Sequence, residues 1–144
     1  MRLSAKAEYA CAAMLELAAS HRDPQPVRIR MIAEAQAISP RFLVQILLQL
    51  KTAGLVTSVR GASGGYQLAR SPDAISLASI INAIEDRTIA PQSALKADHR
   101  TPAVEVLLGV WQEVQVQEQR LLERLSLSEL LRRSQQSNAL VFQI

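Results

Sequence analysis

Three of the five glycines in this chain of 144 residues stand within five positions, at Gly61, Gly64 and Gly65. Short runs that are typical of strands lie on either side, residues 56–59 before and residues 66–68 after. Glycine accepts positive φ without a Cβ clash and so permits a narrow chain reversal. The sequence therefore predicts a β-hairpin with a slim, exposed tip and Arg60 at its mouth. An ordinary surface hairpin is the alternative.

Two short helices are predicted immediately before the hairpin, over residues 29–36 and from Arg41 to about residue 53. Between them, Ser39 is the expected N-cap, and Pro40 at the first helical position sacrifices no hydrogen bond. Gly54 stands where a helix end favours a left-handed residue. We expect the inner face of the second helix to consist of its periodic apolar residues, Phe42, Leu43, Ile46, Leu47 and Leu50.

Further helices are predicted from Ser4 to about residue 20, with Ser4 as N-cap, and over residues 76–85. A helix, a helix–turn–helix and a hairpin in this order are typical of a winged helix-turn-helix domain, here residues 1–86. In that arrangement the second helix of the pair lies in the major groove of DNA. The fold class expected is mainly α with one small β-hairpin.

Residues 87–102 lose all periodicity and indicate a flexible connection. Residues 103–124 then form the longest predicted helix, and Ser126 with Glu129 has capping-box spacing for a last short helix to about Arg133. A long amphipathic helix after a complete small domain usually packs on a partner subunit, although it can also fold back on its own domain. The third region, residues 103–144, is therefore assigned to dimerisation, through Val104, Leu107, Leu108, Trp111, Val114, Leu121 and Leu122.

Charge is distributed unevenly along the chain. Residues 1–70 hold nine Lys or Arg against four Asp or Glu, whereas residues 71–144 hold seven against nine. The first half is thus the side expected to approach a polyanion. No apolar run approaches the roughly 20 residues that span a membrane, and the lone Cys11 fits a reducing compartment, so we expect a cytoplasmic protein without membrane contact.

The basic and glycine residues suggest specific contacts with double-stranded DNA. Arg60 can enter a narrow minor groove, where negative potential concentrates, and the glycines let backbone amides approach phosphates. Arg41 can contact guanine or phosphate, and Gln45 can pair with adenine. Each of these side chains could instead be only solvated. The candidate DNA-contacting residues are Arg28, Ser39, Arg41, Gln45, Arg60, Gly61, Ser63, Gly64, Gly65 and Tyr66.

No constellation of a nucleophile, a base and an orienting group is visible, so the sequence does not indicate an enzyme. His21 and His99 both lie in polar breaks, and spacing pairs neither with metal ligands. Cys11, close to apolar residues of the first helix, is interpreted as a buried structural thiol, with a redox sensor as the alternative.

Several motifs resemble one family. The opening Met1-Arg2-Leu3-Ser4, the Ile38-Ser39 turn, Gly54-Leu55-Val56 and the Arg60-Gly61…Gly64-Gly65-Tyr66 hairpin are similar to those of the Rrf-type winged helix-turn-helix regulators, the family of IscR, NsrR and CymR. The resemblance implies a homodimer whose long helix crosses to the other subunit. It also implies that Arg60 enters a minor groove and that Ser39, Arg41 and Gln45 contact DNA from the recognition helix. Val44 stands where cluster-dependent relatives often have an acidic residue.

The same resemblance brings a disagreement about the sensor. Cluster-binding members place three cysteines between the wing domain and the long helix, but residues 89–105 contain none. Asp98, His99 and Glu105 are a weak alternative set of metal ligands. They do not replace the cysteines, because iron–sulfur clusters are held mainly by thiolates. We therefore expect no iron–sulfur cluster and no other cofactor, with a small molecule or a partner protein as the possible effector.

The sequence thus predicts a sequence-specific DNA-binding regulator, a homodimeric repressor on a palindromic operator. The alternative is a winged-fold module that acts mainly through a protein partner.

Overall fold

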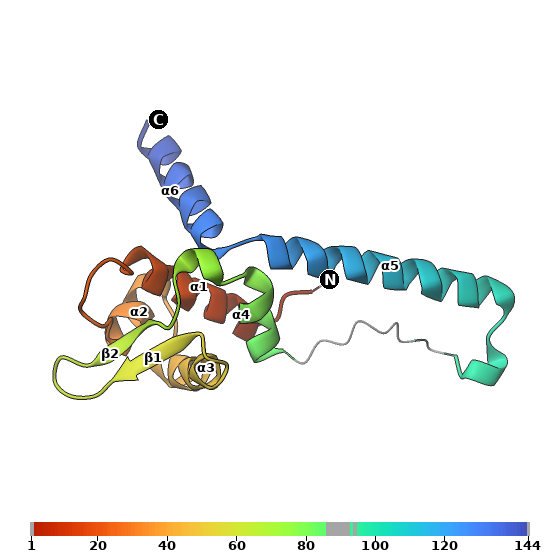
Figure 1. Ribbon diagram of the computed structural model, residues 1–144, viewed down its shortest axis with the longest axis horizontal. Helices are drawn as coiled ribbons and strands as arrows, with labels where there is room; N and C mark the ends of the chain where they lie inside the picture. Colours follow the sequence, from red (N-terminus) through yellow and green to blue (C-terminus); the bar gives the residue numbers. More distant parts are fainter. Residues whose placement is uncertain (1, 86–92, 94, 144) are drawn as a thin grey trace.

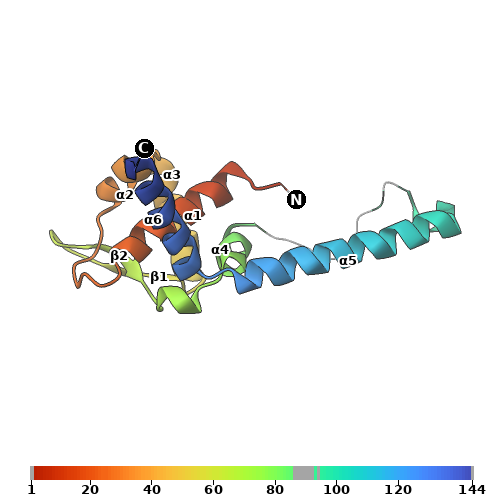
Figure 2. The same ribbon diagram turned by 90° about the horizontal axis from the view of Figure 1, so that it is seen from above.

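A computed structural model describes residues 2–85, 93 and 95–143 of the chain. Helices α1 to α4 and the hairpin form one body, from which α5 extends as a long arm, while α6 leaves the junction in another direction (Figures 1 and 2). The elements are α1 (Ala5–Ala19), α2 (Ile29–Gln36), α3 (Pro40–Thr52), β1 (Val56–Val59), β2 (Gly65–Leu68), η1 (Pro72–Ala74), α4 (Leu77–Ile84), η2 (Ala97–His99), α5 (Pro102–Arg124) and α6 (Leu127–Gln143). The mainly α fold with one antiparallel hairpin confirms the predicted class.

Helix α1 is the centre of the body, because α2, α3, α4, α6 and β2 all pack against it. Its buried face is built from small residues, Ala7, Ala10 and Ala13, each with no exposed surface. Small side chains let neighbouring helices approach closely at native packing density. The helix begins at the predicted N-cap, since the Ala7 amide donates to Ser4 Oγ at 3.1 Å.

The α2–α3 pair is the predicted helix–turn–helix. Helix α2 ends at Ala37, whose φ of 53° is left-handed, and this is a conformation that few non-glycine residues adopt. The next residue, Ile38, is buried and anchors the turn. Helix α3 then contributes a fully buried stripe to the core, Leu43, Ile46, Leu47 and Leu50.

Two expectations about α3 need correction. Ser39 is its N-cap by position, but the Ser39 side chain accepts no capping hydrogen bond. Phe42 was expected in the core, yet 56% of it is exposed. Successive helical residues are about 100° apart, so the buried arc centred between Leu43 and Leu50 leaves Phe42 at its edge.

The end of α3 has the hydrogen bonds of a Schellman motif. The Leu55 amide donates to the Leu50 carbonyl at 3.0 Å and the Gly54 amide to the Lys51 carbonyl at 3.0 Å. Gly54 itself has φ +77°, which confirms the left-handed residue expected there.

Replacing Gly54 with alanine should lower the free energy of unfolding by about 1–2 kcal/mol, because an L-residue at this φ is strained although nothing blocks its Cβ. Urea denaturation with an unchanged m-value measures the loss. A variant as stable as the parent would show that the left-handed cap is not required.

The junction between α5 and α6 is attached to the body through backbone. The Leu77 amide donates to the Leu125 carbonyl at 2.7 Å, and the Leu127 amide donates to the Ile75 carbonyl at 2.8 Å. Leu127 is fully buried in the main core, and Leu131 packs against it. Part of the predicted third region therefore completes the core of the first.

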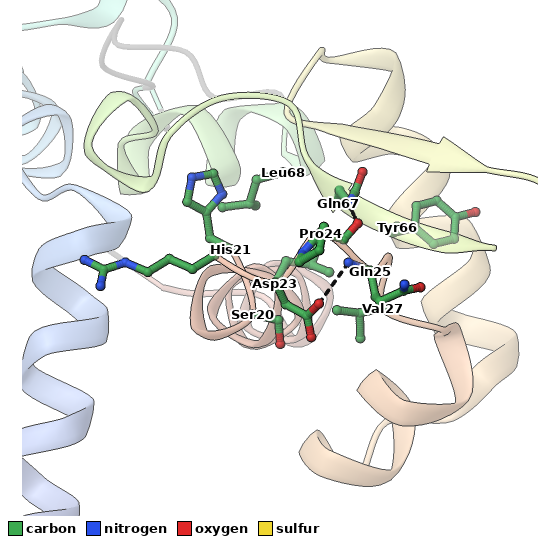
Figure 3. A pocket seen from close by; sticks show the side chains of 11 residues that line it. Ser20, His21, Asp23, Pro24, Gln25, Val27, Tyr66, Gln67 and Leu68 are labelled. Atoms are coloured by element: carbon green, nitrogen blue, oxygen red, sulfur yellow. Dashed lines mark hydrogen bonds between the residues drawn. The ribbon is translucent and has the colours of Figure 1, made fainter. Parts of the chain in front are cut away.

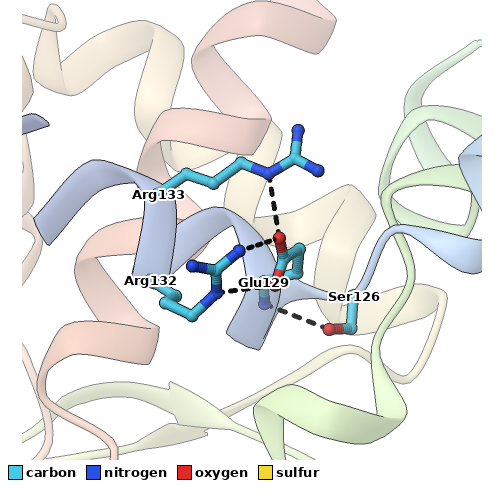
Figure 4. A network of polar contacts seen from close by, with 4 residues as sticks. All are labelled: Ser126, Glu129, Arg132 and Arg133. Atoms are coloured by element: carbon cyan, nitrogen blue, oxygen red, sulfur yellow. Dashed lines mark hydrogen bonds and ion pairs between the residues drawn. The ribbon is translucent and has the colours of Figure 1, made fainter. Parts of the chain in front are cut away.

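Helix α6 is longer than predicted, since it continues to Gln143 instead of ending near Arg133. At its start the Glu129 amide donates to Ser126 Oγ at 3.1 Å, which is half of the expected capping box. The other half is not formed, because the Glu129 carboxylate accepts from Arg132 and from Arg133 instead (Figure 4). Hydrogen bonds from Arg132 and then Arg133 lower the pKa of Glu129 to about 2.

Of the predicted connection, residues 87–102, residues 87–92 and 94 lie outside the described residues. Of its described part, residues 97–99 form the short η2 turn. Helix α5 then begins with an N-cap that the sequence analysis did not identify, as the Val104 amide donates to Thr101 Oγ1 at 3.2 Å.

Within the described part of the chain, no single helix is long and apolar enough to cross a membrane. The α2–α3 pair reaches the required length and composition only when its two helices are combined, and they are bent by 114° at the turn. The cytoplasmic location stays a prediction.

Candidate nucleic-acid interface

The predicted hairpin is present, with β1 and β2 paired antiparallel from Val56 opposite Leu68 to Val59 opposite Gly65. Five residues, 60–64, form the tip, and the Gly64 amide donates to the Gly61 carbonyl at 3.0 Å to close it. Gly61 has φ +108°, so one tip residue uses the freedom that glycine provides. The hairpin is hereafter called the wing, residues 56–68.

Two glycines of the wing are required for steric reasons. A Cβ on Gly64 would lie 2.1 Å from the Val59 carbonyl oxygen, and one on Gly65 would lie 2.4 Å from the Val27 carbonyl oxygen. The second clash arises because Val27 forms an isolated antiparallel bridge with Tyr66, in which the Val27 amide donates to the Tyr66 carbonyl at 2.9 Å and the Tyr66 amide donates to the Val27 carbonyl at 2.8 Å. No sequence pattern indicated this bridge.

Arg28 holds the wing tip from the start of α2. Its guanidinium donates to the carbonyl of Ala62, a residue 34 positions away in the chain. From the sequence, Arg28 was expected only as a candidate DNA contact, and its bond to the wing tip was not foreseen. The bond fixes the direction in which the tip projects from the body.

Helix α3 and the wing lie on the same side of the body (Figure 1). Helix α3 packs against β1, and Lys51 Nζ donates to Ser58 Oγ at 2.7 Å across their junction. Arg41 and Gln45 are exposed on α3, and Arg60 is exposed at the wing tip. Within the described residues neither arginine has an ion-pair partner, so both cations are available to an anion.

The candidate contact residues fall into two groups. Those with exposed side chains or exposed backbone are Arg28, Ser39, Arg41, Gln45, Arg60, Gly61 and Ser63, whereas Gly64, Gly65 and Tyr66 are half-buried. Tyr66 packs against the main core, which gives it a structural part. Contact of each of these residues with DNA stays a prediction.

A cavity of about 220 Å³ lies between the α1–α2 loop and β2 (Figure 3). Its wall is held by two hydrogen bonds, from Gln67 Nε2 to the Pro24 carbonyl at 3.0 Å and from the Gln25 amide to Asp23 Oδ1 at 2.9 Å. His21 also lines it. The cavity can take a small polar molecule next to the wing.

The long helix α5 presents the apolar face predicted for dimerisation. Leu107, Trp111, Val114 and Leu121 are between 45% and 61% exposed, and Val104 and Leu108 are half-buried. Leu122 does not fit the prediction, because it is buried against Ala78 and Ile81 of α4 in the same chain. Val106 and Val110, which the sequence analysis did not name, extend the exposed apolar surface.

Cys11 lies on α1 and packs against both the main core and the small α4–α5 cluster. Burial, and to a smaller extent the Glu85 carboxylate, raise the pKa of the Cys11 thiol to about 11. The group is therefore protonated at neutral pH, as expected for a structural thiol.

Alkylation of Cys11 by iodoacetamide at pH 8 should be about 100-fold slower in the native protein than in urea, because only the thiolate reacts and its fraction falls as the pKa rises. Mass spectrometry of timed samples measures both rates. Equal rates in the two states would contradict the burial of this thiol.

Among the described residues, no three His, Cys, Asp or Glu side chains lie together as a metal site would require. Asp98 and His99 approach each other at 3.8 Å, and Glu105 instead approaches Arg100 at 3.9 Å. All three sequence candidates, Asp98, His99 and Glu105, are exposed.

Residues 3–133 match the Rrf2 model, described as an iron-dependent transcriptional regulator. The chain is 35% identical to the HTH-type transcriptional regulator IscR of Vibrio cholerae over 131 residues, which are 91% of this chain and 75% of IscR. Its structure is similar to that of CymR, the global cysteine regulator of B. subtilis, with a TM-score of 0.79 and 33% identity over 92% of this chain and 98% of CymR. It is also similar to T. potens IscR, with a TM-score of 0.77 and 34% identity over 95% of this chain and 90% of that one.

Proposed function

The chain belongs to the Rrf2 family of transcriptional regulators, and from this premise we propose that it acts as a homodimer on a palindromic operator. It is a DNA-binding transcriptional regulator and not an enzyme. In the proposed complex each α3 lies in a major groove and each wing tip in the adjacent minor groove. The two half-sites are about one helical turn, or a multiple of it, apart.

The observation that carries this proposal is the shared face of α3 and the wing. Arg41 and Arg60 are exposed without an ion-pair partner among the described residues, and both project from elements that are fixed to each other by packing and by the Lys51–Ser58 hydrogen bond. Unpaired cations on such a face can contact DNA phosphates and base edges. The thin tip between Gly61 and Gly64 suits a narrow minor groove.

Dimerisation is proposed through α5. An exposed apolar stripe on a helix that leaves the body is costly in water, and a second copy of the same helix covers it with self-complementary geometry. Leu107, Trp111 and Val114 lie at the centre of the proposed interface, at 61%, 54% and 45% exposure in the single chain.

Arg60→Ala should weaken operator binding by about 1–3 kcal/mol, or about 5- to 150-fold, because it removes the cation of the wing tip. The operator is first obtained by selection from a random-sequence duplex pool, and affinity is then measured by fluorescence anisotropy at several salt concentrations. The slope of log affinity against log salt should also become less steep by about one.

Arg22→Ala is the matched control, since it removes the same charge from an exposed residue of the α1–α2 loop, which lines the cavity beside β2 and does not belong to the wing tip. It should leave affinity within about twofold of the parent. Equal losses in the two variants would mean that the wing makes no special contact.

The donors of this chain do not fit an iron–sulfur cluster. Such clusters are held mainly by cysteine thiolates. The sequence contains one cysteine, and its thiol is kept protonated by the raised pKa described above. We therefore place the regulator among members that sense something other than a cluster, and absorption spectroscopy with iron analysis after anaerobic purification tests this. A coloured, iron-loaded protein would contradict it.

Repression, with release by a small molecule or a partner protein, completes the proposal. The cavity beside β2 supports a small polar effector, because an occupant would contact the strand that carries the wing. Action mainly through a protein partner is the competing function. It would be favoured if Arg41 and Arg60 were dispensable for regulation in cells while the α5 surface was not.

A further inference from the structure

The outward face of α3 carries more apolar surface than a phosphate-binding face needs. Phe42, Val44 and Leu48 are 56%, 49% and 60% exposed, and these three residues are here called the apolar border. The buried stripe of α3 is already complete without them, because Leu43, Ile46, Leu47 and Leu50 are all fully buried. The apolar border therefore has no role in the core of this chain.

The apolar border surrounds the two polar residues of the same face. Side chains three or four positions apart on a helix are neighbours. Val44 is thus next to Arg41 and Leu48, Phe42 is next to Gln45, and Leu48 follows Gln45 one turn later. The exposed surface around the proposed base-contacting residues is apolar on both sides.

The neighbouring elements leave this face open toward the wing. Helix α3 packs against α1, α2, α4 and β1, and its buried stripe belongs to the main core. Lys51, three positions beyond Leu48, reaches across to Ser58 of β1. Val44 and Lys51, seven positions apart, share one side of the helix, so Val44 lies on the side of α3 from which Lys51 reaches the wing.

Of the four bases, only thymine presents an apolar group in the major groove, its C5-methyl. We propose that the apolar border reads C5-methyl groups of thymines beside the base pairs contacted by Arg41 and Gln45, so that each half-site requires thymine for its methyl group. This inference rests on the proposed function, since it assumes that α3 lies in the major groove. The proposal gives the apolar border a part in sequence specificity, which the polar contacts of Arg41 and Gln45 alone leave it without.

Uracil in place of thymine tests the proposal, because it removes only the methyl and keeps every hydrogen-bonding group. Each thymine of the selected duplex is replaced singly, and affinity is measured by fluorescence anisotropy. At one or more thymines per half-site, we expect the affinity for the duplex to fall about fourfold when uracil replaces thymine. This is the usual effect of losing the burial of one methyl-sized group. 5-Methylcytosine in place of each cytosine should leave the affinity for the duplex unchanged, if the methyl groups that the apolar border contacts are those of thymines.

Each alanine variant, Val44→Ala, Leu48→Ala or Phe42→Ala, should lose the preference for thymine at the base that its side chain contacts. At that base, the affinity for the thymine duplex divided by the affinity for the uracil duplex should fall close to one. These residues are exposed, so the variants should fold as the parent does, which circular dichroism checks. Gln45→Ala is the matched control on the same face. It should weaken binding to thymine and uracil duplexes equally and leave their ratio unchanged.

The outcomes separate the two proposals. If the chain selects no duplex, the proposed function fails. If it selects a duplex and the ratio is one at every thymine, DNA binding stands and the reading of methyl groups is wrong. A ratio that persists in all three alanine variants would likewise assign the methyl contact to other residues.

Discussion

Leu107→Asp should convert the protein to a monomer and lower its affinity for the palindromic duplex by about 10²–10⁴-fold. Two half-sites bound by one dimer gain an effective concentration that two independent monomers lack. The substitution places a carboxylate in the centre of the proposed α5 interface, where desolvation opposes pairing. Because Leu107 is 61% exposed in the single chain, the monomer itself should fold normally.

Sedimentation equilibrium measures the change, with the parent at twice the 15.8 kDa of one chain and the variant at that mass. Gln112→Asp adds the same carboxylate to an exposed position on the other side of α5 and should remain dimeric. A duplex with a single half-site should bind the variant and the parent chain with similar affinity. A dimeric Leu107→Asp protein with full affinity for the palindrome would exclude α5 as the interface.

Gly64→Ala should lower operator affinity at least as much as Arg60→Ala, by about 10- to 100-fold or more. The added Cβ would lie 2.1 Å from the Val59 carbonyl oxygen and 2.9 Å from both the Arg60 carbonyl carbon and the Gly61 carbonyl oxygen. All three are backbone atoms, so the tip itself must change shape. The proposed contacts of the tip with DNA should then be lost or displaced.

Gly109→Ala in α5 is the matched control, because nothing lies within 4 Å of its added Cβ. It should leave operator affinity unchanged and can raise helix stability by up to about 1 kcal/mol. Gly64→Ala should keep nearly the melting temperature of the parent, since the tip contributes no residue to the core. Parental affinity in Gly64→Ala would show that the shape of the tip does not matter.

Much of the DNA-binding domain could be predicted from local chemistry. The glycine cluster located the wing, Gly54 the end of α3 and Ser4 the start of α1, because each signal is a backbone requirement of one residue. Phe42 shows the limit of this reasoning. Helical periodicity gives the width of an apolar arc, but the neighbouring elements decide which part of it is covered.

The contacts that orient the site could not be predicted. Arg28 and Ala62 are 34 residues apart, and only the fold brings the guanidinium to that carbonyl. Val27 pairs with Tyr66 through a single bridge, too short to give a strand pattern. Residues 134–138, in the middle of α6, are all Ser, Gln or Asn, and this polar run interrupts the apolar periodicity that would have extended the predicted helix.

Hydroxyl-radical footprinting of the selected duplex tests the central claim, that α3 and the wing bind DNA together. The radicals attack deoxyribose mainly from the minor groove, so a wing tip lying there protects the sugars it covers. The account predicts two protected minor-groove segments related by the two-fold symmetry of the operator, and both should be lost in Arg60→Ala while the dimer remains bound at higher protein concentration. The same protected segments in Arg60→Ala, or none in the parent complex, would contradict it.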